Sequence, residues 1–220
     1  MHTIPSTLIT RHTPSITSLP RNTALNVGLL GGSFDPPHEG HLLITKQAIK
    51  FFNFHYVIWL VTPQNPFKNH APATLQQRML ECNQKTAGNP KILVSDIEKH
   101  IKTVQTCDTL IHLHYMYPRI NFVWLMGADN LYSFHKWHRW EQITGTTPIV
   151  IFPRGTSSTE AGLSKFASRF SAYRANANDR IFFKQPAPCW TLFNRGPTID
   201  ISSTYIRSNT ADNNKSRINT

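Results

Sequence analysis

The chain has 220 residues, 40% of them hydrophobic, which is enough for one α/β domain with a substantial core. Its net charge of +11, from 23 Lys and Arg against 12 Asp and Glu, fits nucleic acid, a membrane surface or small polyanionic substrates. No apolar run reaches the ~18 residues of a membrane span. The three scattered cysteines, without a CxxC pair, argue against a disulfide scaffold or zinc ribbon and are typical of a cytoplasmic protein with reduced thiols.

The basic residues are spread along the chain, without a Lys/Arg block or an RNA-binding signature. We therefore expect phosphorylated small molecules as partners, with no nucleic acid and no membrane. A basic RNA-binding module is the alternative from another functional class, and salt-dependent RNA binding without ATP turnover would favour it. The sequence leaves the oligomeric state open, a homo-oligomer included.

The first 24 residues differ from the rest of the chain. Residues 1–24 carry nine Ser or Thr, three Pro and no acidic residue, with apolar residues too sparse and unperiodic to bury anything. This composition predicts a flexible extension. A transit peptide is the weaker interpretation, because the stretch has only two arginines and no amphipathic pattern. The domain itself is expected at 25–208, followed by a polar tail at 209–220.

The first expected element is a buried strand at 27–30 that ends in the turn Gly31-Gly32-Ser33. The missing side chains in this turn let backbone amides approach a ligand closely. A helix follows two prolines, and His38 and His41 stand three residues apart at its start, so that both point towards one spot. That spot lies beside helix N-terminal amides, which favour an anion.

Simpler interpretations of this stretch exist. A glycine turn between strand and helix often serves only tight packing, and this one is not the GxGxxG dinucleotide pattern. The His-Glu-Gly-His run is not the HExxH of a zinc protease either, and its glycine suits a turn better than a helix interior. The glycine turn, the proline pair and the two histidines are much less common together, so we interpret the stretch as a phosphate site with chemistry attached.

Strands and helices alternate along the remaining chain. Further strands are expected at 56–61, 91–95, 121–126, 148–152 and 190–193, and helices at 73–86, 106–117, 131–143, 160–171 and 203–208. Strands that are apolar throughout, alternating with helices, predict a parallel sheet covered on both faces. The expected fold class is α/β, a Rossmann-like doubly wound sheet in three layers. Ligands bind such sheets at the carboxyl ends of the strands.

Other candidate residues follow these strands. Lys68 lies in a proline-bracketed loop where a cation could close over phosphate, or it is an ordinary exposed lysine. Asp129 could accept from a ribose hydroxyl or cap the next helix. Trp137 is equally suited to a core and to stacking on an aromatic ring. Near the end, the hydroxyls and Arg207 in Ile201 to Arg207 on one helix start could cradle a polyphosphate.

Taken in order, these blocks resemble bacterial nicotinate-nucleotide adenylyltransferases. The resemblance rests on Gly31 to His38 with His41, on Gly127 to Trp137 and on Ile201 to Arg207, and it covers roughly Leu25 to Ser208. The first block alone is shared by the wider nucleotidyltransferase superfamily with an HxGH signature. The other two blocks narrow the resemblance to the pyridine-nucleotide branch.

The resemblance implies transfer of AMP from ATP to nicotinate mononucleotide, which gives nicotinate adenine dinucleotide, a precursor of NAD, and pyrophosphate. It implies Mg²⁺ held mainly through the ATP phosphates, with no metal ligand from the protein. The catalytic residues would be His38, His41 and Arg207. The ATP site would comprise Gly32, Ser33, Phe34, His38, His41, Asp129, Arg154, Ser203, Thr204 and Arg207. The nicotinate mononucleotide site would comprise Ser33, Lys68, Thr106 and Trp137.

Two positions depart from the family pattern. The order Pro-Arg-Gly surrounds Arg154 where the family usually has Arg-Pro-Gly, and Phe67 precedes Lys68 where a histidine is usual. A pantetheine-phosphate adenylyltransferase or a cytidylyltransferase would keep the HxGH block without the Trp137 platform, and both stay open as alternatives.

Overall fold

Six parallel strands form one sheet in the order β3-β2-β1-β4-β5-β6. This computed structural model describes residues 16, 19–63, 73–153, 164–197 and 203. The strands are β1 (Leu25–Gly32), β2 (Tyr56–Val61), β3 (Ile92–Ser95), β4 (Ile120–Gly127), β5 (Ile149–Phe152) and β6 (Trp190–Leu192). The expected strands are all present, with small shifts at their ends. Because β1 pairs with β2 on one side and β4 on the other, the chain reverses its winding direction at β1.

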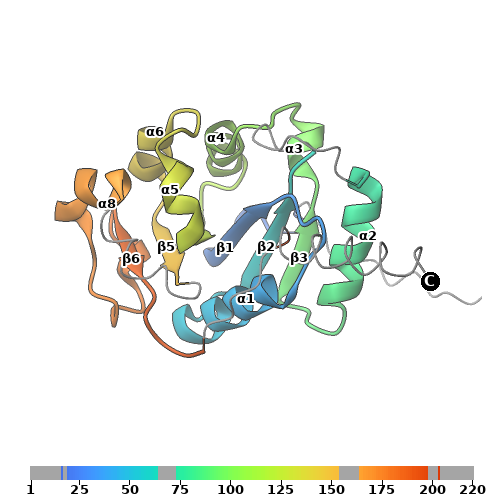
Figure 1. The fold of residues 1–220 in the computed structure, drawn as a ribbon, viewed down its shortest axis with the longest axis horizontal. Coiled ribbons are helices and arrows are strands. Elements are labelled where there is room, and N and C mark those ends of the chain that lie inside the picture. The colour runs from blue at the N-terminus through green and yellow to red at the C-terminus, as the bar shows by residue number, and fades with distance from the viewer. Residues whose placement is uncertain (1–15, 17–18, 64–72, 154–163, 198–202, 204–220) are drawn as a thin grey trace, which may run out of the picture.

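Helices cover both faces of this sheet, so the predicted α/β doubly wound fold is confirmed (Figure 1). The helices are α1 (Glu39–Phe52), α2 (Leu75–Thr86), α3 (Ile97–His100), α4 (Thr106–Met116), α5 (Leu131–Phe134), α6 (Trp140–Thr146) and α8 (Lys165–Arg169). Short 3-10 turns lie at Ala128–Asn130 (η2), Ser171–Tyr173 (η4) and Phe182–Lys184 (η5). In Figure 1, α1 lies below the sheet, and α4 and α6 lie above it.

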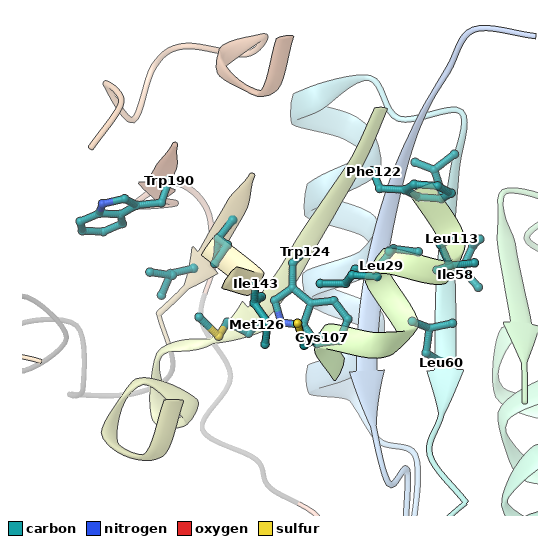
Figure 2. Close-up of a cluster of buried hydrophobic side chains, with 14 of the residues drawn as sticks. Leu29, Ile58, Leu60, Cys107, Leu113, Phe122, Trp124, Met126, Ile143 and Trp190 are labelled. Carbon is teal, nitrogen blue, oxygen red and sulfur yellow. The ribbon is translucent and has the colours of Figure 1, made fainter. Parts of the chain in front are cut away.

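Successive strand residues point to opposite faces, which produces two separate cores. Leu29, Ile58 and Trp124 belong to the core beneath α4, α5, α6 and α8, and Figure 2 shows their side chains gathered with Phe122 and Leu113. Val57 and Leu125, with their neighbours of opposite parity, belong to the core beneath α1, α2 and η5. Burial on both faces explains why the strands are apolar throughout.

Several helical segments differ from the expectation. The single helix expected at 131–143 is divided into α5 and α6, because Arg139 takes the left-handed conformation at φ 50°. The short helix α3 was not expected. The helix expected at 73–86 begins at Leu75, where the Thr74 hydroxyl accepts from the Gln77 amide at 3.2 Å. Of the helix expected at 203–208, the structure describes Ser203, which is helical.

The expectation that residues 1–24 bury nothing is wrong at two positions. Ile16 is 1% exposed and Leu19 is 5% exposed, and both belong to the core beneath α4. The Tyr117 hydroxyl donates to the Ile16 carbonyl at 3.0 Å. Two isolated apolar residues carry no periodicity, so their burial depends on a neighbouring surface that the local sequence does not reveal.

Two further properties concern the described residues. Cys82, Cys107 and Cys189 are free and buried. Among the helices that the structure describes, none combines the length and the hydropathy of a membrane span.

Candidate functional site

The glycine turn, Gly31-Gly32-Ser33, lies at the carboxyl edge of the sheet. It begins later than predicted, because Gly31 and Gly32 are the last residues of β1 and pair with Leu60 and Val61 of β2. A Cβ added to Gly31 would lie 2.4 Å from Cη2 of Trp124, so glycine is required there for the strand to pass over the indole. After the turn, Phe34 takes the left-handed conformation at φ 47°, which is strained for a bulky residue. Its buried ring stacks on Trp59, with centroids 4.8 Å apart. Trp59 in turn donates to the Thr45 hydroxyl of α1 at 2.8 Å.

The two histidines begin α1 and cap it reciprocally. The Gly40 amide donates to Nδ1 of His38 at 3.2 Å, and the His38 amide donates to Nδ1 of His41 at 3.1 Å. Their ring centroids are 3.8 Å apart, which confirms that both imidazoles lie at one spot. The amides at the start of α1 were expected to be available for an anion. This is wrong for the Gly40 amide, which donates to the His38 ring. Gly40 also lies inside α1, although the sequence suggested that a glycine between the two histidines suits a turn better than a helix interior.

These caps determine where each ring carries its proton. A backbone N–H can only donate, so each Nδ1 must accept and is unprotonated. In a neutral imidazole the proton then sits on Nε2. His38 and His41 are therefore both set as Nε2–H donors, which suits hydrogen bonds to phosphate oxygens.

The carboxyl-terminal motif reaches this spot. The Ser203 hydroxyl donates to the Pro36 carbonyl at 3.0 Å, across 167 positions of sequence. Pro36 precedes the histidine pair by two residues, so Ser203 lies beside the amino-terminal motif. Of the carboxyl-terminal motif, the structure describes Ser203 alone, and it places that residue beside the amino-terminal motif.

A pocket opens at the same edge of the sheet, with about 670 Å³ of empty space that is partly open to solvent. Four of the predicted site residues, Gly32, Ser33, Thr106 and Trp137, lie in its wall, which joins segments far apart in sequence. The described lining residues are Gly31, Gly32, Ser33, Thr62, Glu98, Val104, Gln105, Thr106, Trp124, Asn130, Trp137 and His138.

Helix α4 begins at the wall of this pocket. Its N-cap, Gln105, makes no side-chain capping bond, and Thr106 is its first residue. The first amides of a helix have no partner within the helix and carry the positive end of its dipole. The start of α4 therefore favours an anionic group in the pocket.

Trp137 and Trp124 supply aromatic surface to the pocket. Trp137 is half-buried and meets the rings of Phe134 at 5.2 Å and Trp124 at 6.4 Å, edge to face in both cases. These contacts fix the indole of Trp137 at the pocket wall, so the core and ligand roles that the sequence left open are compatible.

Glu98 is the acidic residue among those that line the pocket. It lies on α3, is 5% exposed, and accepts from the Thr109 hydroxyl at 3.1 Å. Burial raises the pKa of Glu98, and hydrogen bonds from Thr62 and Thr109 oppose that rise.

The remaining predicted residues are not brought together by what the structure describes. Asp129 is exposed on η2, after β4, and does not line the pocket. Lys68, Arg154, Thr204 and Arg207 lie outside the described residues. Within those residues, no three His, Cys, Asp or Glu side chains gather as a metal site would require.

Sequence reasoning missed two residues at this edge, Glu98 and Arg78. Arg78 is 1% exposed on the apolar face of α2, between Leu75 and Cys82. A charged residue at the i+3 position of an apolar stripe was a usable signal. Glu98 gave no comparable signal, because the short helix that carries it was not predicted.

The chain is similar to known proteins in sequence and in fold. A family model described as cytidylyltransferase-like matches residues 29–209. A protein of Ruegeria pomeroyi named "probable nicotinate-nucleotide adenylyltransferase" is 44% identical over 183 residues, 83% of this chain and 85% of the relative. A protein of the same name from Cereibacter sphaeroides is 43% identical over 183 residues, 83% of this chain and 96% of the relative.

Solved structures with the same fold include the Plasmodium falciparum nicotinic acid mononucleotide adenylyltransferase in complex with NaAD. It aligns with a TM-score of 0.64 at 19% identity, over 84% of this chain and 83% of the other. At that identity the likeness concerns the fold. The similarity to the curated relatives extends over most of both chains, so this chain belongs to the nicotinate-nucleotide adenylyltransferase family.

Proposed function

We propose that the chain transfers AMP from ATP to nicotinate mononucleotide, forming nicotinate adenine dinucleotide and pyrophosphate. The observation that carries this proposal is the bond from the Ser203 hydroxyl to the carbonyl of Pro36, because Pro36 lies two residues before His38. One triphosphate can then contact both motifs. The names of the relatives support the choice of acceptor.

The pocket has the chemistry that the acceptor needs. Nicotinate mononucleotide carries a flat aromatic ring and a carboxylate at one end and a phosphate at the other. We assign the ring to Trp137 and the carboxylate to Thr106 and the amides that begin α4. Nicotinamide mononucleotide lacks that negative charge, so the helix dipole favours the acid. Its phosphate would then lie toward the glycine turn and Ser33.

The reaction needs no general base. The acceptor phosphate is already an oxygen nucleophile, so it attacks the α-phosphorus of ATP in line while pyrophosphate leaves on the opposite side. The protein contributes positioning and charge stabilisation. The Nε2–H groups of His38 and His41 donate to phosphate oxygens that gain negative charge as the bond to pyrophosphate breaks.

Mg²⁺ is part of the proposal, held by ATP phosphates and water. The described residues fit this arrangement, because they offer hydrogen-bond donors at the edge of the sheet and no carboxylate cage of their own. When bound, the ion would neutralise charge on the polyphosphate. Ser203 and, outside the described residues, Thr204 and Arg207 would hold the β- and γ-phosphates.

A substrate panel tests the proposal. ATP-dependent pyrophosphate release is measured with nicotinate mononucleotide, nicotinamide mononucleotide and phosphopantetheine as acceptors. We expect turnover with the nicotinate compound, weaker turnover with the amide and none with phosphopantetheine. Turnover with phosphopantetheine alone would move the chain to another branch of the superfamily, and release with no acceptor would refute the proposal.

His41 provides the test of the catalytic assignment. Loss of one preorganised donor typically lowers turnover by about 10²–10³-fold, so we expect that loss in His41→Ala with the fold intact. His55→Ala is the matched control, since the exposed His55 ring also accepts a backbone amide at Nδ1, from Asn26 at 3.0 Å, far from the pocket. Near wild-type turnover in His41→Ala would remove His41 from its role.

A further inference from the structure

Arg78 connects three separate backbone segments beside the site. Its Nε donates to the Ala73 carbonyl and its Nη2 to the Pro63 carbonyl, each at 2.9 Å. Its Nη1 donates to the carbonyls of Ser33, at 2.6 Å, and Thr62, at 2.8 Å. The guanidinium thus joins the glycine turn after β1, the chain after β2 and the start of α2.

This arrangement is built rather than incidental. The side chain is 1% exposed, and burying a guanidinium is costly unless its donors are satisfied. Burial lowers the pKa of Arg78, and the nearby Asp35 carboxylate opposes that shift. Asp35 also accepts from the Ala73 amide, at 3.4 Å. Charge and hydrogen bonds therefore hold the same three segments.

The bond to Ser33 has a consequence for the next amide. In a trans peptide the C=O and the N–H point in opposite directions. Because the Ser33 carbonyl faces Arg78, the N–H of Phe34 faces away from it. That N–H donates to no group among the residues that the structure describes.

We infer that Arg78 is a positioning residue for AMP transfer, which orients the Ser33–Phe34 peptide so that its N–H donates to a phosphate oxygen of ATP. The inference rests on the proposed function. Phe34 is strained at φ 47°, and such a conformation persists where its surroundings over-determine it. The Arg78 bond holds the peptide on one side, and the stack on Trp59 holds the ring on the other.

The kinetics of Arg78→Lys test this role. Lysine keeps the charge but has one nitrogen, so it cannot reproduce the fork whose three nitrogens reach Ser33, Pro63 and Ala73 at once. We expect kcat to fall by about 10–100-fold while the KM for ATP changes by less than about threefold, since the donor acts mainly as charge develops. Cys82→Ala is the control, because Cys82 is buried one turn further along α2 and makes no bond to the glycine turn.

Both variants are assayed well below their melting temperatures. A merely structural role predicts a lower melting temperature of Arg78→Lys with kcat unchanged, as in Cys82→Ala, and that result would overturn the inference. If Arg78→Lys does not fold, an amide-to-ester replacement at Phe34 removes the N–H and leaves Arg78 in place. We then expect a similar fall in kcat, and full activity of the ester would overturn the inference. Wild-type turnover, measured first, separates either failure from a failure of the proposed function.

Discussion

Gly31→Ala should damage the acceptor pocket through Trp124. The added Cβ would lie 2.4 Å from Cη2 and 2.9 Å from Cζ2 of that indole, whereas carbon atoms pack best at about 3.5–4.0 Å. The ring must therefore move by about 1 Å. Trp124 is 2% exposed and lines the pocket, with Trp137 next to it. The backbone of a central strand cannot yield easily, so the indole is displaced.

The effect has two measurable parts. Overpacking of this kind costs about 1–3 kcal/mol, which for a chain of this size lowers the melting temperature by roughly 2–12 °C. A displacement of about 1 Å at a binding wall can cost up to about 10²-fold in rate. We expect kcat/KM for nicotinate mononucleotide to fall by about 10–100-fold, measured by pyrophosphate release, with a smaller change in the KM for ATP.

Gly28→Ala is the control within the same strand. Its Cβ would meet Cδ1 of Leu125 at 2.8 Å in the other core, away from the pocket. We expect a comparable or smaller loss of stability with unchanged kinetics. If Gly31→Ala loses stability but keeps the kinetics of the wild type, the assignment of this pocket to the acceptor is wrong.

Three further results are expected. Ser203→Ala removes the hydrogen bond to Pro36, worth about 0.5–1.5 kcal/mol, so kcat/KM for ATP should fall by roughly 2–10-fold. An unchanged kcat/KM would contradict the assignment of Ser203 and the histidine pair to one ATP site. Burial raises the pKa of Glu98 above its ordinary 4.5, so the native state binds more protons than the unfolded state between these two pKa values. The free energy of unfolding therefore falls as the pH rises from 4.5 through the pKa of Glu98 in the native state. Urea unfolding of Glu98→Gln should show a weaker fall, and an unchanged pH profile would contradict the reasoning. Burial raises the pKa of Cys82 to about 12 and that of Cys189 to about 11, and Cys107 is also buried. A thiol reagent should therefore react slowly with the folded protein and should react with all three cysteines once the protein is unfolded.

Much of the fold was predictable because its signals are local. Each buried strand is a short apolar run, and the stripe that includes Leu42 and Phe52 marks the face of α1 that packs on the sheet. The division of the helix at 131–143 was not predictable, since the left-handed turn at Arg139 has no glycine or proline to announce it. The burial of Ile16 likewise depends on the shape of a distant surface.

The candidate site, like the fold, has some features that the sequence predicts and others that only the structure shows. His38, His41 and Ser33 were predicted from a motif that the chain carries in itself, and Thr106 was predicted from the family resemblance. The sequence could not reveal that each of the two rings accepts a backbone amide at the start of α1, or that α4 opens on the pocket. These features depend on which backbone groups hydrogen-bond in the fold. Nearly every residue type has the same backbone groups, so the sequence does not mark them.

The sequence by itself determined the alternation of strands and helices, the position of the glycine turn and the order of the motifs, because hydrophobic period and turn chemistry act over a few neighbouring residues. Only the tertiary structure decided that Ser203 reaches Pro36, that Glu98 lines the pocket and that Arg78 bonds the carbonyl of Ser33. These contacts join segments that are distant in sequence. They arise only when the strand order brings the carboxyl ends of the strands to one edge of the sheet.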